Sequence, residues 1–121
     1  DERVVFDRPI GQNQAIQHPL AAAYTDLLAA KQLVYSAAEV VDEIAQKDAG
    51  AQANAAKYQA AEAAFAAADA AVQTHGGFGV AVEYDVERYF REARLTRLVP
   101  ITQELILNFI GENVLELPRS Y

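Results

Sequence analysis

The sequence has 121 residues and 52% of them are hydrophobic, which suits one domain with a core and excludes a chain that is disordered throughout. Seventeen acidic and ten basic residues give a net charge of −7, which argues against a nucleic-acid binder, because such proteins need a basic surface. The absence of cysteine excludes a disulfide scaffold, a zinc ribbon and a thiol nucleophile. No apolar run approaches the ~20 residues that span a bilayer and no signal peptide opens the chain, so we expect no membrane contact and a cytoplasmic location.

Alanine is the most unusual part of the composition, at 25 of 121 residues. It is the best helix former, and its small side chain lets helices approach one another closely. The composition therefore predicts an all-α fold. Together with the segments below, it predicts an up-down four-helix bundle that forms a single domain over residues 1–121.

The first predicted helix is the longest. Residues 1–12 are a poor helix, because a proline and a glycine interrupt them. Asn13 is a suitable cap for a helix that runs to about Lys47 and ends at residues 48–50. The helix either starts at His18–Pro19 or is kinked there. Its apolar positions recur at close to the helical period: Ile16, Leu20, Leu27, Leu28, Val34, Ala38, Val41 and Ile44.

The second predicted helix, over residues 51–75, carries thirteen alanines. Tyr58, Phe65 and Val72 recur among them at a spacing of seven, as larger side chains on a face made of methyl groups. We expect neighbouring helices to pack against this face at short distance. Gly76–Gly77 ends the helix.

Two shorter helices follow. The third is predicted over residues 84–98, with charge pairs such as Glu87–Arg91 and Glu83–Arg88 near its start. After an interruption at Pro100, Thr102 is placed to cap a last helix over 103–116. The apolar stripe of this last helix is predicted to be Leu105, Ile106, Phe109, Ile110, Val114 and Leu117.

Most patterns that carry chemistry are missing from the sequence. Dinuclear metal bundles need Glu-x-x-His pairs, but neither His18 nor His75 has a glutamate three positions before it, so we expect no metal site. No glycine elbow surrounds a serine, which argues against a hydrolytic triad. Gly76-Gly77-Phe78-Gly79 follows a helix rather than a strand, so on its own it favours a helix cap and tight turn over a phosphate-binding loop.

Two segments nevertheless resemble one family when they are taken together. Arg3-Val4-Val5-Phe6-Asp7-Arg8-Pro9-Ile10, followed by Gln14 and Leu20-Ala21, resembles the opening of the C-terminal helical domain of acyl-CoA dehydrogenases. Gln73-Thr74-His75-Gly76-Gly77-Phe78-Gly79, followed by Glu83-Tyr84-Asp85-Val86-Glu87-Arg88 and Arg91-Glu92-Ala93, is similar to the second signature of that family. Order and spacing both fit, and the resemblance covers essentially the whole chain.

The resemblance implies a flavoprotein that uses FAD to remove two hydrogens from Cα and Cβ of an acyl-CoA thioester. In the family a carboxylate takes the α proton while the β hydrogen leaves as hydride to the flavin. The C-terminal bundle helps to form the core of a dimer of dimers and contacts FAD, including that of a neighbouring subunit. A homo-oligomer, or a heteromeric partner, and an electron-transfer acceptor protein are therefore implied as partners.

The first signature implies three FAD contacts. Arg3 would meet the pyrophosphate through its guanidinium fork. Phe6 would lie beside the cofactor, and Gln14 would offer it an amide. Asp7 replaces a glycine that is frequent in the family, and we expect its carboxylate to point away from the pyrophosphate.

The rest of the chain supplies the other implied contacts. Gln73, Gly76 and Gly77 would let an amide and bare backbone approach the dinucleotide. Thr102 matches a position that touches the FAD of its own subunit. Glu104 stands at a contact position where many members have glutamine.

Pro100 is the largest departure from the family pattern. Many members place the catalytic glutamate 27 residues after the glutamine that matches Gln73, and here that position is proline, which cannot act as a base. Three explanations are open. The base lies on a helix that precedes Asp1, the parent protein is a non-catalytic partner in a heteromeric enzyme, or Glu104 reaches the site. No catalytic residue is therefore assigned within the chain.

The family also predicts more protein than this chain contains, because its members carry an N-terminal helical domain and a middle β domain before the bundle. We therefore expect a C-terminal domain, either part of a larger protein or a separate subunit, that is inactive alone and exposes an apolar face that favours association. The alternative is a non-catalytic helical interaction or oligomerisation module, or the partner subunit of a heteromeric dehydrogenase.

Overall fold

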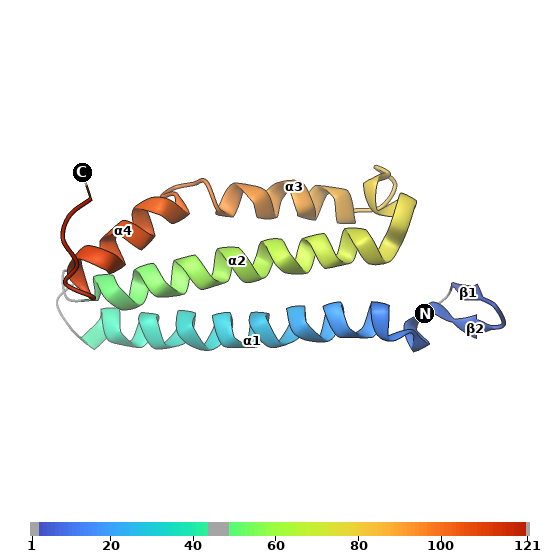
Figure 1. Cartoon of the computed structure of the whole chain (residues 1–121), viewed down its shortest axis with the longest axis horizontal. Helices are drawn as coiled ribbons and strands as arrows, with labels where there is room; N and C mark the ends of the chain where they lie inside the picture. The colour runs from blue at the N-terminus through green and yellow to red at the C-terminus, as the bar shows by residue number, and fades with distance from the viewer. Residues whose placement is uncertain (1–2, 44–48, 121) are drawn as a thin grey trace.

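The computed structural model describes residues 3–43 and 49–120. Within them lie four α helices: α1 (Gln14–Glu43), α2 (Gly50–His75), α3 (Val86–Thr96) and α4 (Gln103–Asn113). The short elements are an antiparallel hairpin of β1 (Val4–Val5) and β2 (Arg8–Pro9) and the 3-10 helices η1 (Ile10–Gln12) and η2 (Gly76–Val80). The predicted all-α fold with four helices is confirmed (Figure 1).

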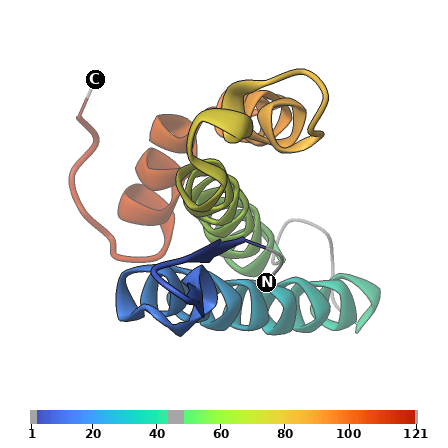
Figure 2. The same cartoon turned by 90° about the vertical axis from the view of Figure 1, so that its right-hand side faces the viewer.

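α2 is the central helix of the fold. α1 packs antiparallel to it along one side, and α3 and α4 follow one another along the other side (Figure 1). Seen from the end, α1 lies below α2, while α3 lies to its upper right and α4 to its left (Figure 2). Because α2 has neighbours in several directions, it needs small side chains around most of its circumference, which accounts for its thirteen alanines.

The contact between α1 and α2 is a seam of alanines, as the composition predicted. The buried positions of α1 are Ala23, Ala30 and Ala37, spaced seven residues apart, so they stay on one side of the helix. The buried positions of α2 are Ala56, Ala61, Ala63 and Ala68. The most deeply buried positions of both helices are therefore alanines.

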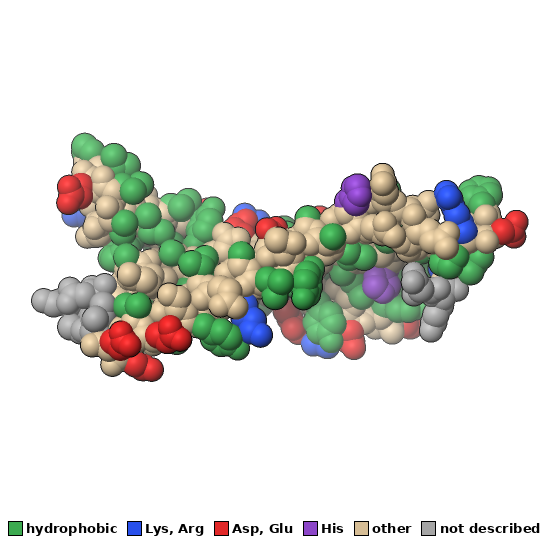
Figure 3. All heavy atoms as spheres, turned by 90° about the horizontal axis from the view of Figure 1, so that it is seen from below, with side chains coloured by type: hydrophobic (Ala, Val, Ile, Leu, Met, Phe, Trp, Pro, Cys, Tyr) green, Lys and Arg blue, Asp and Glu red, His purple; other side chains and the backbone are tan. Residues whose placement is uncertain are grey.

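Outside this seam the domain buries little apolar surface. Ile106 of α4 is the one large side chain that is fully buried among the described residues. The accessible surface is 8654 Å² for a mass of 13.2 kDa, where a compact monomer would expose roughly 6,400 Å². Hydrophobic side chains form several clusters on the face that α1 occupies (Figure 3). The exposed apolar side chains of α1 include Leu20, Leu27, Val34 and Val41.

The predicted limits of the first helix are confirmed at its start. Asn13 immediately precedes α1, and its carbonyl oxygen accepts hydrogen bonds from two amides of the first turn. Since α1 begins at Gln14, Pro19 lies inside the helix, and the alternative start at His18–Pro19 was wrong. The predicted end at Lys47, with Ile44, lies outside the described residues.

The other helices begin and end close to their predicted limits. Gly76 ends α2 with a φ of +60°, a conformation that glycine adopts without strain. The Thr102 hydroxyl caps α4 by accepting a hydrogen bond from the Leu105 amide at 3.4 Å. α3 and α4 are each a few residues shorter than predicted, at eleven residues.

Two packing predictions for these helices were wrong. Arg88 pairs with Asp85 at 3.1 Å and with Glu92 at 3.2 Å, not with Glu83, because Glu83 precedes the helix and does not share its face. In α4, Ile106 is buried, but the predicted stripe positions Leu105, Val114 and Leu117 are exposed. The last two lie beyond Asn113, where the helix has already ended.

Candidate functional site

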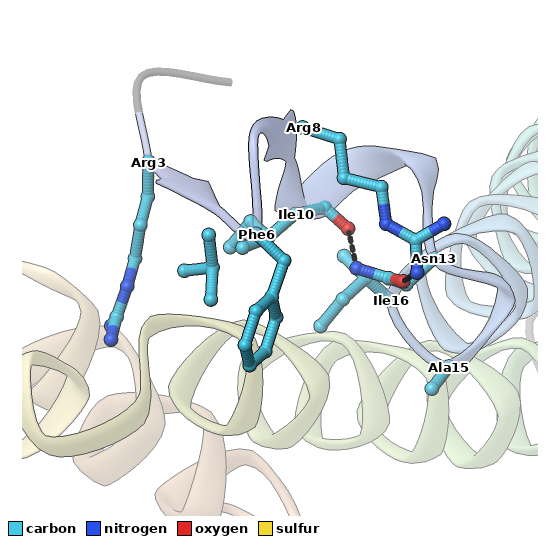
Figure 4. A pocket seen from close by; sticks show the side chains of 8 residues that line it. Arg3, Phe6, Arg8, Ile10, Asn13, Ala15 and Ile16 are labelled. Carbon is cyan, nitrogen blue, oxygen red and sulfur yellow. Dashed lines mark hydrogen bonds between the residues drawn. The ribbon is translucent and has the colours of Figure 1, made fainter.

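The hairpin and the start of α1 border an open cavity of about 450 Å³. Arg3 and Phe6 reach over it from the hairpin, while the α1 side supplies an apolar floor (Figure 4). A guanidinium beside an aromatic ring suits a ligand with both an anionic and a planar part. The residues that line the cavity are Arg3, Val5, Phe6, Arg8, Ile10, Asn13, Ala15 and Ile16.

The hairpin turns tightly at Phe6 and Asp7. Both residues have positive φ angles, 53° and 60°, as in the two-residue turn that suits the twist of a hairpin. Neither is glycine, so the turn holds backbone strain. Phe6 is 93% exposed, which leaves its ring free to contact a ligand or another chain.

Asn13 fastens the hairpin to α1. Its side-chain amide donates a hydrogen bond to the Ile10 carbonyl at 3.0 Å, and its side-chain oxygen accepts one from Arg8 at 3.1 Å (Figure 4). Sequence reasoning anticipated Asn13 only as a helix cap and missed this hairpin, because Phe6–Asp7 is not a usual turn sequence. Of the implied contacts in this segment, Gln14 is exposed at the start of α1 and does not line the cavity.

A second cavity, of about 470 Å³, continues from the first between α1 and α2. Ala15 and Ile16 line both cavities, and Gln73 lines the second. The structure thus brings Gln73 to the same end of the molecule as Arg3 and Phe6, although Phe6 and Gln73 are 67 positions apart in the sequence. The hairpin and the C-terminal end of α2 share this end in both views (Figures 1 and 2).

The three glycines of the turn after α2 serve different purposes. Gly76 needs its positive φ. Gly79 is buried, and a Cβ there would collide with the Val72 carbonyl oxygen and stand 2.9 Å from the Val72 Cα. Gly77 has neither constraint, because its φ is ordinary and a Cβ would meet nothing within 4 Å. Its backbone is left bare and accessible for no reason internal to the described structure.

Thr102 and Glu104 lie elsewhere, at the start of α4. The adjoining Gln103 contacts Tyr58 and Glu62 in the first half of α2. Glu62 and Gln73 are eleven residues apart, which is about 16 Å along a helix. The implied FAD residues therefore form two separated groups: Arg3, Phe6, Gln73, Gly76 and Gly77 at one end, and Thr102 and Glu104 near the middle of the molecule.

The Glu104 carboxylate is a weak base in this setting. Hydrogen bonds from its own backbone amide and from the Thr102 hydroxyl, with further attraction from Arg97 and Arg94, hold the pKa of Glu104 below its usual range. A general base works best when its pKa lies near the operating pH. This argues against Glu104 as a replacement for the glutamate that is missing at Pro100, which itself lies in an exposed loop.

The arginines of α3 are mostly paired along the helix. Glu87 and Arg91 form the predicted ion pair at 2.7 Å, and this hydrogen bond lowers the pKa of Glu87. Arg94 and Arg97 lie over the Phe65 ring of α2, at 5.7 and 5.1 Å from its centre. Arg94 and Arg97 therefore help to pack α3 against α2, whereas Arg91 faces solvent.

A polar network that the sequence did not reveal joins α2 to the α3–α4 connection. The Gln103 amide donates to Glu62 at 2.9 Å and to the Tyr58 carbonyl at 3.2 Å. Lys57 donates to the Gln103 side chain at 3.2 Å and to the Thr96 carbonyl at 2.7 Å. Arg97 pairs with Glu62 at 2.8 Å. We call Lys57, Glu62, Arg97 and Gln103 the α2–α4 network.

Two further features bear on the site. In residues 3–43 and 49–120, no three acidic or histidine side chains gather into a group that could hold a metal ion. No helix in this described part of the chain combines the length and the hydropathy needed to cross a membrane.

Comparison with known proteins agrees with this geometry. The family model of the acyl-CoA dehydrogenase C-terminal domain matches residues 1–115. The chain is 44% identical over 119 residues to the acyl-CoA dehydrogenase FadE12 of Mycobacterium tuberculosis, covering 98% of this chain and 31% of that protein. It is 39% identical over 104 residues to the caffeyl-CoA reductase-Etf complex subunit CarC of Acetobacterium woodii, covering 86% of this chain and 27% of that protein.

A solved structure agrees as well. A chain described under an electron transferring flavoprotein of Acidaminococcus fermentans superposes with a TM-score of 0.88 at 35% identity, covering 94% of this chain and 30% of that chain. The chain thus spans about a third of the length of these relatives.

Proposed function

Because the chain belongs to the acyl-CoA dehydrogenase family, through its C-terminal domain, we propose that it completes the FAD site of an enzyme that dehydrogenates acyl-CoA thioesters. In this proposal it works with an N-terminal helical domain and a middle β domain and is inactive alone. The observation that carries it is that the cavity of Arg3 and Phe6 and the bare backbone of Gly77 lie at the same end of the molecule (Figure 1). Oxidoreductase chemistry in fatty-acid metabolism, and a cytoplasmic location, follow as parts of the same proposal.

The residues of the hairpin end fit a dinucleotide. Arg3 donates charge-assisted hydrogen bonds to the pyrophosphate, and the exposed Phe6 ring packs against a planar group. Gly76 and Gly77 let the cofactor approach the backbone with no side chain between them, and Gln73 offers its amide. When bound, FAD supplies the acceptor for the hydride that leaves the β carbon of the substrate.

The second group serves a different cofactor molecule in this proposal. Thr102 and Glu104 lie about 16 Å along α2 from the first group, so we assign them to the FAD of the same subunit and the hairpin end to that of a neighbour. An oligomer follows from this division. The surface that would join the copies is apolar and exposed along α1.

The base that takes the α proton lies outside this chain in our proposal. Pro100 cannot act, and the lowered pKa of Glu104 makes it a poor acceptor at neutral pH. A second candidate, the non-catalytic partner subunit of a heteromeric dehydrogenase, is favoured by the same proline. The two differ when the purified complete protein is mixed with acyl-CoA without oxygen: a catalytic subunit bleaches its flavin alone, and a partner subunit does so only with a second dehydrogenase chain.

The glycine turn gives the sharpest test of the cofactor site. Gly77→Ala in the complete enzyme should weaken FAD binding about tenfold, because a methyl group would stand between backbone and cofactor, with no change in the melting temperature of the apoprotein. FAD titration by fluorescence and thermal unfolding measure the two effects. Gly79→Ala is the matched control, since its methyl group would collide with Val72 and lower stability instead.

Two substitutions separate this proposal from a purely structural module. Arg3→Ala and Gln73→Ala should each reduce FAD retention during gel filtration of the complete enzyme, by removing a guanidinium and an amide. If neither loses flavin, the interaction or oligomerisation reading is correct. Acceptance of electrons by a transfer flavoprotein, which the similarity to an Etf-complex subunit supports, is assayed with the same preparations.

A further inference from the structure

The segment that joins α3 to α4 is held only at its two ends. Leu98, Val99 and Ile101 are 45%, 55% and 47% exposed, so their side chains do not anchor the loop in a core. At its base, the backbone N–H of Gln103 donates to the Arg97 carbonyl at 3.4 Å and closes the loop. Its placement on the molecule therefore depends on what holds Arg97 and Gln103.

Both ends of this loop are held by the α2–α4 network. Gln103 is 6% exposed and uses both halves of its side-chain amide, donating to Glu62 and the Tyr58 carbonyl and accepting from Lys57. The Glu62 Oε1 atom accepts a hydrogen bond from Gln103 at 2.9 Å and forms an ion pair with Arg97 at 2.8 Å, so one carboxylate oxygen contacts both ends of the loop. Lys57 adds a bond to the Thr96 carbonyl at 2.7 Å, just before the loop.

The loop contains or adjoins residues that the family resemblance links to FAD and to catalysis. Thr102 and Pro100 lie within it and Glu104 follows it. The side chain of Gln103 is buried and uses all three of its hydrogen bonds in this arrangement, and any other arrangement would leave those polar atoms unpaired. Apolar side chains would also fill this space, but they would not fix the register of α4 against α2.

We infer that Gln103, Glu62, Lys57 and Arg97 are positioning residues that set the place of the 98–102 loop, and with it Thr102, relative to a bound flavin. The inference rests on the proposed function for its flavin readout. Gln103 holds the central place, because it alone contacts two members of the network on α2 and begins α4. None of the four residues belongs to the implied FAD contacts.

Gln103→Leu in the complete enzyme tests this inference, since leucine keeps most of the volume and removes all three side-chain hydrogen bonds. We expect the dissociation constant of FAD to rise about tenfold, the bound-flavin absorption band to change shape, and amide hydrogen exchange in residues 97–103 to accelerate. Asn54→Leu is the matched control, because the Asn54 side chain bonds to the Gly50 carbonyl of its own helix.

Glu62→Gln supplies the conservative variant, since an amide oxygen still accepts from Gln103. It should retain most of the FAD affinity and the wild-type exchange rates of residues 97–103. If Gln103→Leu does not fold, Lys57→Met, which removes two bonds of the network, should produce the same changes in smaller measure.

Two outcomes distinguish a failure of the positioning role from a failure of the proposed function. Equal FAD affinity, flavin spectrum and exchange rates in wild type and Gln103→Leu would overturn the positioning role. A wild-type enzyme that binds no flavin would overturn the proposed function, while the exchange measurement still decides whether the network holds the loop.

Discussion

Asp7 sits in a backbone conformation that normally selects glycine. Its φ of 60° falls in the left-handed region, and the neighbouring Phe6 has a φ of 53°. Aspartate tolerates this region better than most residues, and Phe6 does not. The strain lies at the most exposed aromatic side chain of the described chain, next to a cavity, which is where strained backbone commonly serves binding.

Asp7→Gly should therefore stabilise the protein, by roughly 0.5 kcal/mol, because relief of the strain exceeds the added chain entropy of glycine. Thermal unfolding of the complete protein measures the gain, and Asp7→Ala, which keeps a Cβ at positive φ, should melt at a lower temperature than wild type. A lower melting point for Asp7→Gly would contradict the strained turn.

The same residues show what sequence reasoning could reach. Asn13, Gly76 and Thr102 marked helix ends correctly, because capping chemistry is local to a few residues. The hairpin was not predicted, because Phe6 and Asp7 are not the residues that usually form its two-residue turn. The site residues Arg3, Gln73 and Gly77 came from a family resemblance, and their approach to FAD stays a prediction.

At the scale of elements, the alanine seam between α1 and α2 is the main packing contact. Ala30 is 4% exposed and Ala63 is 2% exposed, so neither of these two positions leaves space for a larger side chain. Alanine content indicated close packing, but periodicity pointed to the larger residues of α1. Leu20, Leu27 and Val34 flank the seam and remain exposed, since the alanines alone occupy its centre.

Ala30→Leu should accordingly destabilise the fold by about 1–3 kcal/mol, since the added atoms force α1 away from α2. Chemical denaturation gives the free energy of unfolding. Ala21→Leu adds the same atoms at an exposed position of the same helix and should change that free energy little. Equal effects of the two changes would mean that the seam is not closely packed.

The α2–α4 network could not be predicted from the sequence, because its residues are far apart along the chain. Lys57 and Gln103 are 46 positions apart, and nothing in a helical period links residues on separate helices. The prediction that Arg88 pairs with Glu83 was wrong because the start of the helix was misplaced by two residues. The helix begins at Val86, so Asp85 and not Glu83 lies within reach. Contacts within one helix are predictable once its first residue is known.

At the scale of the whole molecule, many large hydrophobic side chains remain exposed after the chain has folded. Among residues 3–43 and 49–120, the buried hydrophobic side chains are eight alanines and Ile106. Large exposed patches on soluble domains usually mark interfaces. The expected association with other domains or copies agrees with this surface. Its partners stay proposals.

The domain produced by itself should self-associate, giving a light-scattering mass above 13.2 kDa. Replacing Leu27 and Val34 together by glutamine should lower that mass toward the monomer, because it makes the exposed face of α1 polar. Glu39→Gln, an exposed change on the same helix, is the control. A strictly monomeric wild-type domain would count against the interface.

Because α2 is central, its length fixes the distance between the two groups of implied FAD residues. The helix carries Gln73 at one end and, through Glu62 and Gln103, fixes Thr102 further back, so the separation and the angular phase of the two groups are written into its length. Deleting one residue between Glu62 and Gln73 would turn one group by about 100° against the other. A change in the length of this stretch of α2 would therefore separate the two groups in both distance and direction.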